Sequence, residues 1–215
     1  MNAQNTTFQE MLGDIDVITS EFLRQELLPD VGQVCSCGCG ERRQVMCEDC
    51  ADSTPTCTSC FVTEHSRNPF HWARLWDEDR GFAKRMDISG LKPGGYAIPI
   101  GHSGERCPFR RTNPSEPIIG TSFIVLAENG VHNTLVEFCD CIGAQPHKVQ
   151  LLRSRLFPAT IKDPKMAFTF SLLRAYRIHS FESKGSAHDY LGALQRLTNN
   201  ARPSTVSVSA LQNYK

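Results

Sequence analysis

Apolar residues near the start of the chain recur at helical spacing. The stripe runs from Phe8 to Leu27 and stops before Pro29, which predicts an amphipathic N-terminal helix. From Val34 to His71 the apolar content collapses, and Cys, Gly, Asp and Thr dominate. Such a segment cannot bury enough side chain to fold alone, so the pattern predicts a metal-stabilised module.

After His71 the pattern becomes that of an ordinary globular domain. Alternating β-branched and aromatic residues at 122–127 and 131–139 flank Asn129-Gly130 and predict a β-hairpin, with a further strand at 96–101. Helical spacing predicts one helix from Met166 to about Ser183 and another from 187 to 197. The tail from Thr198 has no apolar stripe, and we expect it to be frayed.

Together these patterns predict a small α+β protein. We expect an N-terminal amphipathic helix at 1–33, a zinc-binding module at 34–72, a hairpin-rich domain with C-terminal helices at 73–198 and a flexible or truncated tail at 199–215.

Charge is distributed unevenly along a chain whose 23 basic and 23 acidic residues balance. The first thirty residues hold six acids and only Arg24. From Lys148 to Lys215 there are eleven Lys/Arg against Asp163, Glu182 and Asp189. The C-terminal third therefore presents a basic surface or joins an acidic neighbour.

Ten cysteines accompany a start that lacks the basic and apolar regions of a secretory signal. We therefore expect reduced thiols in the cytosol or nucleus, where clustered Cys and His more often bind metal than form disulfides. No apolar run approaches the ~18 residues of a membrane span, so we expect no membrane association, and no feature indicates a small-molecule substrate.

Eight Cys and His residues occur in closely spaced pairs between positions 37 and 71. Four such ligands bind one zinc ion at a structural site, and two residues between paired cysteines suit one ion, so eight predict two zincs. In order, they are Cys37, Cys39, Cys47, Cys50, Cys57, Cys60, His65 and His71.

The pairs are expected to interleave, which resembles a B-box-type cross-brace. The first and third pairs (Cys37, Cys39, Cys57, Cys60) share one ion, and the second and fourth pairs share the other. Only one residue separates the first two cysteines, and Cys35 is an alternate ligand beside Cys37. Both sites have four protein ligands and no open position for an activated water, so we expect structural rather than catalytic zinc.

A second cluster combines residues far apart in sequence. The hairpin that ends at Cys139 can bring Cys139 and Cys141 to Cys107, with His102 as the fourth ligand of a possible third zinc. His132 and His147 are alternates for the fourth position. Ordinary packing of three thiols is the competing interpretation.

Several motifs in a fixed order resemble one known family. After the cysteine-rich brace come HSRNPFHW (65–72), Trp76-Asp77, Gly101-His102 before Cys107-Pro108, Gly130-Val131-His132, Cys139-Asp140-Cys141, QLLR (150–153), LFPAT (156–160) and 194–199. This order is similar to the cysteine-cluster region that precedes the catalytic domain of KDZ (Kyakuja, Dileera and Zisupton) transposases. The resemblance covers roughly residues 34 to 200.

The resemblance implies a zinc-binding accessory domain of a transposase, truncated or domesticated and without transposase activity of its own. It also implies a nuclear location and assistance in DNA binding. The basic residues that would face phosphate are Lys148, Arg153, Arg155, Lys162, Lys165, Arg174 and Arg177. The alternative is a B-box-like protein-interaction or self-association module without DNA binding.

Overall fold

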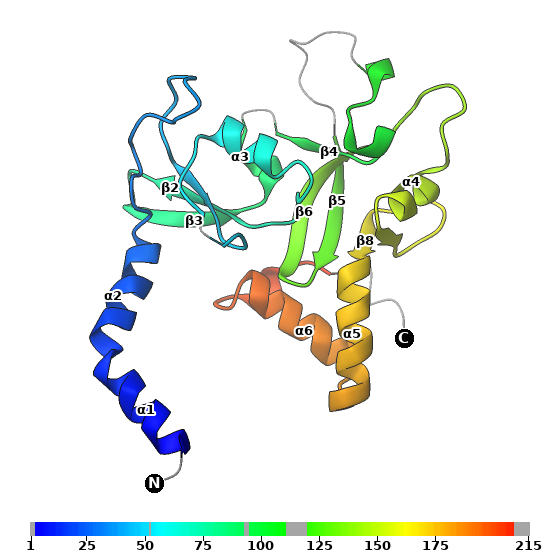
Figure 1. Cartoon of the computed structure of the whole chain (residues 1–215). Helices are drawn as coiled ribbons and strands as arrows, with labels where there is room; N and C mark the ends of the chain where they lie inside the picture. The colour runs from blue at the N-terminus through cyan, green and yellow to red at the C-terminus, as the bar shows by residue number, and fades with distance from the viewer. Residues whose placement is uncertain (1–2, 52, 93–94, 111–119, 209–215) are drawn as a thin grey trace. The chain divides into compact units, whose positions relative to one another are not determined.

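The computed structural model divides the chain into two compact units (Figure 1). It describes residues 3–51, 53–92, 95–110 and 120–208. The first unit comprises Met1–Phe61 and Trp72–Met86, and the second comprises Val62–His71 and Asp87–Lys215. Helices and two sheets are combined, which confirms the predicted small α+β class.

The first unit begins with two helices where the sequence predicted one. They are α1 (Ala3–Gly13) and α2 (Ile15–Glu26). The break follows from Gly13, a poor helix former. Asp14 is the N-cap residue of α2 but makes no side-chain capping hydrogen bond. The second helix ends before Pro29, as predicted.

A three-stranded antiparallel sheet follows in this unit, and the sequence analysis did not predict it. Its strands are β1 (Val45–Cys47), β2 (Ala73–Asp77) and β3 (Phe82–Met86), in that order. Val45, Cys47 and Ala73 are buried. The Arg85 guanidinium lies 4.5 Å from the ring centroid of buried Trp72, so the long cation covers the indole. The helix α3 (Thr58–Glu64) begins directly after Cys57.

The second unit contains a five-stranded mixed sheet in the order β4-β6-β5-β8-β7. The predicted hairpin is confirmed as β5 (Thr121–Ala127) and β6 (Gly130–Glu137). Ala127 pairs with Gly130, so Glu128 and Asn129 form the loop. Around the hairpin, β4 (Ala97–Pro99) pairs with β6 and β8 (Met166–Thr169) pairs with β5, both in parallel.

The remaining elements are β7 (Leu156–Pro158), which pairs antiparallel with β8, and the helices α4 (His147–Arg153), α5 (Phe170–Ser183) and α6 (Ala187–Thr198). The predicted helix from Met166 was wrong in its start, because residues 166–169 form β8. Thr169 ends the strand and caps α5, its hydroxyl accepting a 3.1 Å hydrogen bond from the Leu172 N–H. The predicted helix at 187–197 is confirmed.

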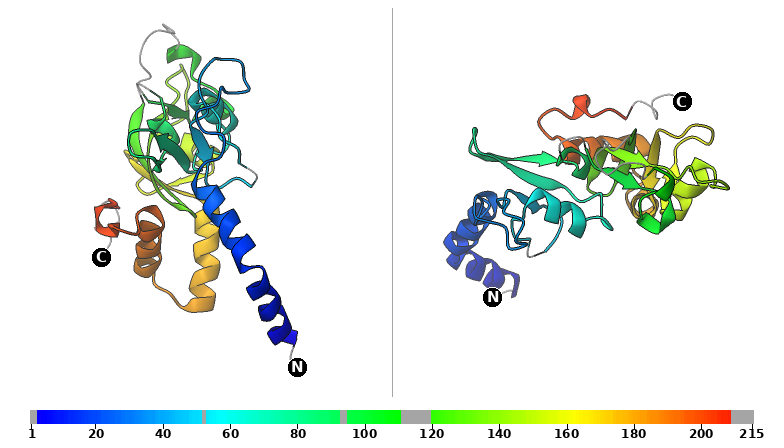
Figure 2. Two further views of the ribbon diagram at one scale, coloured as in Figure 1. Left: turned by 90° about the vertical axis from the view of Figure 1, so that its left-hand side faces the viewer. Right: turned by 90° about the horizontal axis from the view of Figure 1, so that it is seen from above.

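The core of this unit joins the hairpin to both C-terminal helices. Figure 2 shows α5 and α6 side by side, and Leu172 and Leu194 from these helices contact a buried cluster with Leu126 and Val131. Met166, Val206 (8% exposed) and Val208 (6% exposed) also belong to it. The expectation of a frayed tail from Thr198 is therefore wrong for residues up to 208, because Val206 and Val208 are buried against the sheet. Residues 209–215 lie outside the described residues.

In the described part of the chain, no helix combines the length and the apolar character that crossing a membrane would require.

Candidate metal centres

The first cluster gathers four thiols in the first unit. The sulfurs of Cys35, Cys37, Cys57 and Cys60 lie within 4.8 Å of one another. Cys35 Sγ is 3.9 Å from Cys60 Sγ, and Cys37 Sγ is 3.9 Å from Cys57 Sγ. Cys35, treated as an alternate in the sequence analysis, thus belongs to the four-donor group.

Cys39 lies beside this group. Its sulfur is 2.9 Å from Cys37 Sγ and 3.7 Å from Cys57 Sγ, and it forms a three-donor group with Glu41 and Cys57. Cys39 is exposed, whereas Cys35 is buried. Sequence spacing could not distinguish Cys35 from Cys39 as the partner of Cys37, since one residue separates each of them from Cys37.

Local backbone structure holds the thiols of the first cluster. The Cys35 N–H donates to the Glu41 carbonyl at 2.8 Å, which closes a loop through Gly38 and Gly40. Both glycines have positive φ (77° and 79°), a conformation that side chains disfavour. The Cys57 N–H donates to Cys35 Sγ at 3.4 Å. These turns aim the thiols at one point.

The four thiols cannot all ionise without a cation. Hydrogen bonding to the Cys39 thiol lowers the pKa of Cys37 to about 6. The hydrogen bond with Cys37 in turn raises the pKa of Cys60 to about 11, and burial raises the pKa of Cys57 well above its usual range. A bound cation would allow all four thiols to ionise, because metal ligation favours the thiolate form of each.

The second group is the predicted set Cys47, Cys50, His65 and His71, of which the two cysteines belong to the first unit and the two histidines to the second. The two imidazole ring centroids are 5.5 Å apart. Burial raises the pKa of Cys47 to about 12, so this thiol stays protonated unless a cation compensates.

The third group lies in the second unit and unites His102, Cys107, Cys139 and Cys141 within 4.8 Å. His102 Nε2 is 3.0 Å from Cys139 Sγ and 3.5 Å from Cys141 Sγ. Cys107 Sγ is 3.6 Å from Cys141 Sγ. His102 follows β4, while Cys139 and Cys141 follow β6, so the parallel β4–β6 pair brings them to one edge.

Hydrogen bonds shift the pKa values of two thiols in the third group in opposite directions. Burial would raise the pKa of Cys107, but the backbone N–H of Asp140, the His102 ring and further hydrogen bonds together lower it to about 6. The hydrogen bond with Cys107 raises the pKa of Cys141 to about 11. One thiolate thus forms readily while its neighbour remains a thiol.

Gln150 and Gly101 support Cys139. Gln150 Oε1 accepts a 2.8 Å hydrogen bond from the Cys139 N–H, and Gln150 Nε2 donates to the Cys139 carbonyl at 3.0 Å. A Cβ on Gly101 would lie 2.5 Å from the Cys139 Cβ, so only glycine fits there. Sequence reasoning noted both residues within motifs but assigned neither this role.

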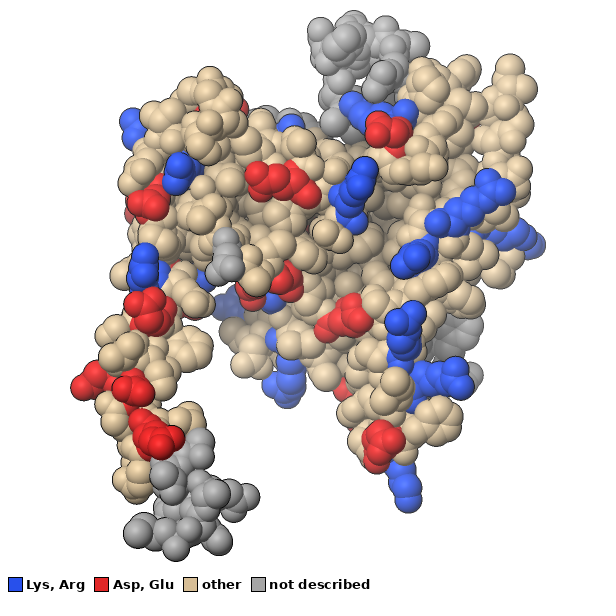
Figure 3. All heavy atoms as spheres, viewed as in Figure 1, with Lys and Arg blue, Asp and Glu red and all other residues tan. Residues whose placement is uncertain are grey.

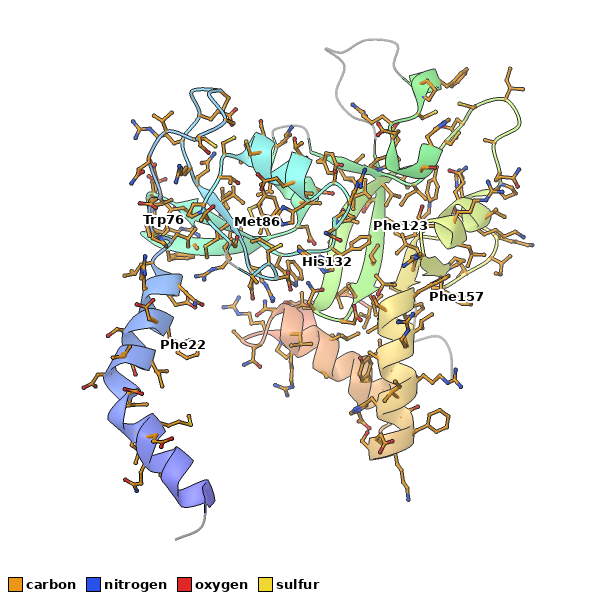
Figure 4. The ribbon with its side chains drawn as sticks, in the orientation of Figure 1. Phe22, Trp76, Met86, Phe123, His132 and Phe157 are labelled. Atoms are coloured by element: carbon orange, nitrogen blue, oxygen red, sulfur yellow. The ribbon has the colours of Figure 1, made fainter. Side chains whose placement is uncertain are left out.

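The two alternate histidines lie elsewhere. His132, on β6 (Figure 4), is buried, with Nδ1 2.7 Å from the Asp87 carboxylate and Nε2 3.0 Å from the Asn129 amide oxygen. The His147 ring stacks on Phe138 with a centroid separation of 3.9 Å.

Most of the predicted phosphate-facing residues lie on the surface of the second unit. Of the seven, Lys148 is half-buried, and the other six are exposed. In Figure 3 basic side chains gather over α4 and α5. Lys165 pairs with Asp163 at 3.2 Å, which offsets its charge.

A match to a known protein family covers the part of the chain that contains the third group. The family model of the CxC2-like cysteine cluster associated with KDZ transposases matches residues 91–202, just over half of the chain, and this range contains all four donors of that group. Neither a curated protein nor a solved structure matches the chain. The chain belongs to the family of CxC2-like cysteine clusters associated with KDZ transposases.

Proposed function

We propose that the chain is a zinc-binding accessory domain of a KDZ-type transposase that binds three structural zinc ions. The observation that carries the proposal is that the first and third groups each hold four thiol or imidazole donors in mutual reach within one unit. The spacing of two cysteines and two histidines in the sequence supports the second. The first group offers four thiols, the second two thiols and two imidazoles, and the third three thiols and one imidazole. These are the donor sets of tetrahedral structural zinc.

The ligands of the first zinc in this proposal are Cys35, Cys37, Cys57 and Cys60. Cys39 stays outside because the four-donor group contains Cys35 in its place, while Cys39 groups only with Glu41 and Cys57. The second zinc takes Cys47, Cys50, His65 and His71, as in a B-box-like brace. The third takes His102, Cys107, Cys139 and Cys141.

The proposed role is structural and not enzymatic. Four protein donors fill a tetrahedral zinc site and leave no position for an activated water. A transposase reaction needs its own carboxylate centre, which this proposal places outside the cysteine cluster. Zinc instead fixes loops that carry little apolar side chain.

Elemental analysis of the purified reduced protein tests the metal assignment. We expect three zincs per chain, and two after Cys35→Ser or Cys107→Ser. The matched control is Cys39→Ser, which should keep three. A wild-type content of two or fewer, or loss of a zinc only in the Cys39 variant, would contradict the assignment.

We further propose that the basic surface of the second unit assists DNA binding in the nucleus. Six exposed Lys/Arg side chains from α4, α5 and the connecting loops support it, since phosphate contacts dominate nucleic-acid affinity. An alternative is a protein-interaction module without DNA binding, favoured by the uncovered apolar residues of α1 and α2.

Fluorescence anisotropy with a mixed-sequence duplex separates the two. Phosphate contacts predict an affinity that falls steeply with salt, with a log–log slope of about −0.9 per contact. Arg153→Glu with Arg155→Glu should weaken binding by roughly tenfold or more at low salt. The matched control reverses Arg42 and Arg43 in the first unit. Unchanged affinity in the Arg153/Arg155 variant would contradict the basic-surface proposal.

A further inference from the structure

The α1–α2 segment exposes an apolar stripe. In the described part of α2 no residue is buried, and Phe22 is 69% exposed and projects from the helix (Figure 4). Ile15, Ile18 and Phe22 fall on one face at spacings of three and four residues. Phe8, Met11 and Leu12 extend the exposed apolar surface into α1. A contiguous exposed patch of this kind marks an interaction surface.

Acidic residues border this stripe. At about 100° per residue, Asp16 lies on one side of the Ile15–Phe22 line and Glu21 on the other. Figure 3 shows acidic side chains along α1 and α2. Glu26 is already paired with Arg74 at 2.6 Å, whereas Glu21 has only an exposed contact with Arg24 at 3.5 Å.

The α5 helix presents an apolar face with basic rather than acidic residues beside it. Tyr176 and His179 pack toward Tyr190 of α6, with ring centroids 5.2 and 5.3 Å apart. The opposite face of α5 is exposed and combines apolar with basic residues. Its members are Phe170, Arg174, Arg177, Ile178 and Phe181, the last 73% exposed. No ion pair of Arg174 or Arg177 occurs within the described ranges.

We propose that the chain forms a dimer in which α2 of one copy packs on the outward face of α5 of the second copy, reciprocally. Each helix presents apolar side chains framed by charge, acidic on α2 and basic on α5, so packing buries both stripes and pairs the charges. Pairing of α2 with α2 would place acidic borders together and be disfavoured. Because each copy contributes the same two faces, the proposed contact is isologous and closes the assembly at two copies.

Two charge-reversal variants of the full, zinc-loaded chain test this arrangement. One, the α2 variant, carries Asp16→Lys and Glu21→Lys; the other, the α5 variant, carries Arg174→Glu and Arg177→Glu. Sedimentation velocity at low ionic strength should show a wild-type dimer and a dimer dissociation constant at least about tenfold higher for each variant alone. Mixed in equal amounts, the variants should form a heterodimer of near wild-type affinity, because both contacts again join opposite charges.

The control variant reverses Lys162 and Lys165, the same charge change outside α5, and should dimerise like wild type. Far-UV circular dichroism and zinc content verify folding of each variant. A monomeric wild type would overturn the proposal. Wild-type dimerisation of the α5 variant alone would instead indicate α2–α2 pairing, and failure of the mixture to associate would overturn the reciprocal contact. None of these outcomes depends on whether the chain binds DNA.

Discussion

Gln150 is a buried side chain whose amide satisfies both backbone groups of Cys139. Gln150 lies in α4, so these bonds link the proposed third zinc site to that helix, and its Nε2 also donates to the Gln145 carbonyl at 2.7 Å. We predict that Gln150→Ala weakens zinc binding at this site by roughly 10–100-fold, as loss of outer hydrogen bonds to a ligand does elsewhere. Competition with a chromogenic chelator measures the change.

Gln145→Ala is the matched control for that measurement. It keeps the Gln145 carbonyl that accepts from Gln150 and removes only an exposed side chain. Equal zinc affinity in the Gln150→Ala and wild-type proteins would show that Cys139 is positioned without Gln150.

Gly101 offers a steric test of the same site. A Cβ at this position would stand 2.5 Å from the Cys139 Cβ and 3.4 Å from the Gln150 side-chain oxygen. We therefore expect Gly101→Ala to displace Cys139 and to reduce zinc content from three to two ions per chain. The control is Gly192→Ala in α6, where a Cβ meets nothing within 4 Å and helix propensity favours alanine. Three zincs in the Gly101 variant would refute the predicted displacement.

At the scale of residues, the sequence predicted which cysteines form the third group but did not settle which histidine joins them. Cys107, Cys139 and Cys141 were identified because a hairpin end and two cysteines one residue apart restrict the possibilities. The choice among His102, His132 and His147 required the fold, since it depends on the parallel β4–β6 pair. His132 points instead to Asp87, a contact between residues 45 positions apart that no local pattern reveals.

At the scale of elements, the spacing of apolar residues predicted a helix or strand correctly where that element buries one face and exposes the other. The β5–β6 hairpin and α6 were predicted because their apolar spacing is regular. The strands β1, β7 and β8 were missed, and their three or four residues are too few to show a period. The five-residue strands β2 and β3 were also missed, because neither alternates between a buried and an exposed face. β8 also reads as the first turn of α5, and only its pairing with β5 distinguishes it.

The Asp87–His132 contact joins two elements of the second unit and predicts a stability effect. Asp87 precedes a short 3₁₀ helix, and its second carboxylate oxygen accepts from the Asn133 N–H at 3.2 Å. Removing the carboxylate takes a partner from a buried ring nitrogen, at a cost of about 1–3 kcal/mol. We expect Asp87→Ala to lower the free energy of unfolding by that amount in urea titrations with excess zinc.

Asp163→Ala is the control for this titration. The Asp163–Lys165 pair is exposed, and such pairs contribute between zero and about 1 kcal/mol. If both alanine variants unfold at the same urea concentration, the Asp87–His132 contact has no special role in stability.

At the scale of the whole molecule, the two units differ in what stabilises them. The second unit has an apolar cluster that includes Leu126, Val131 and Leu194. In the first unit, residues 34–60 hold Cys, Gly and polar side chains between a few buried residues such as Val45. In the proposed assignment, zinc therefore contributes most of the folding free energy of that segment and a smaller share in the hairpin domain.

This contrast predicts a separable response to chelation. When zinc is removed, we expect amides of residues 34–60 to lose protection from hydrogen–deuterium exchange, because their loops have little apolar burial to hold them. Amides of β5, β6 and α6 should keep most of theirs, since Leu126, Val131 and Leu194 pack without a metal ligand among them. Mass spectrometry of peptides before and after chelation measures both regions in one sample, and re-addition of zinc controls for irreversible oxidation of the thiols. Simultaneous loss in both regions would mean that the third zinc, and not the apolar cluster, maintains the sheet.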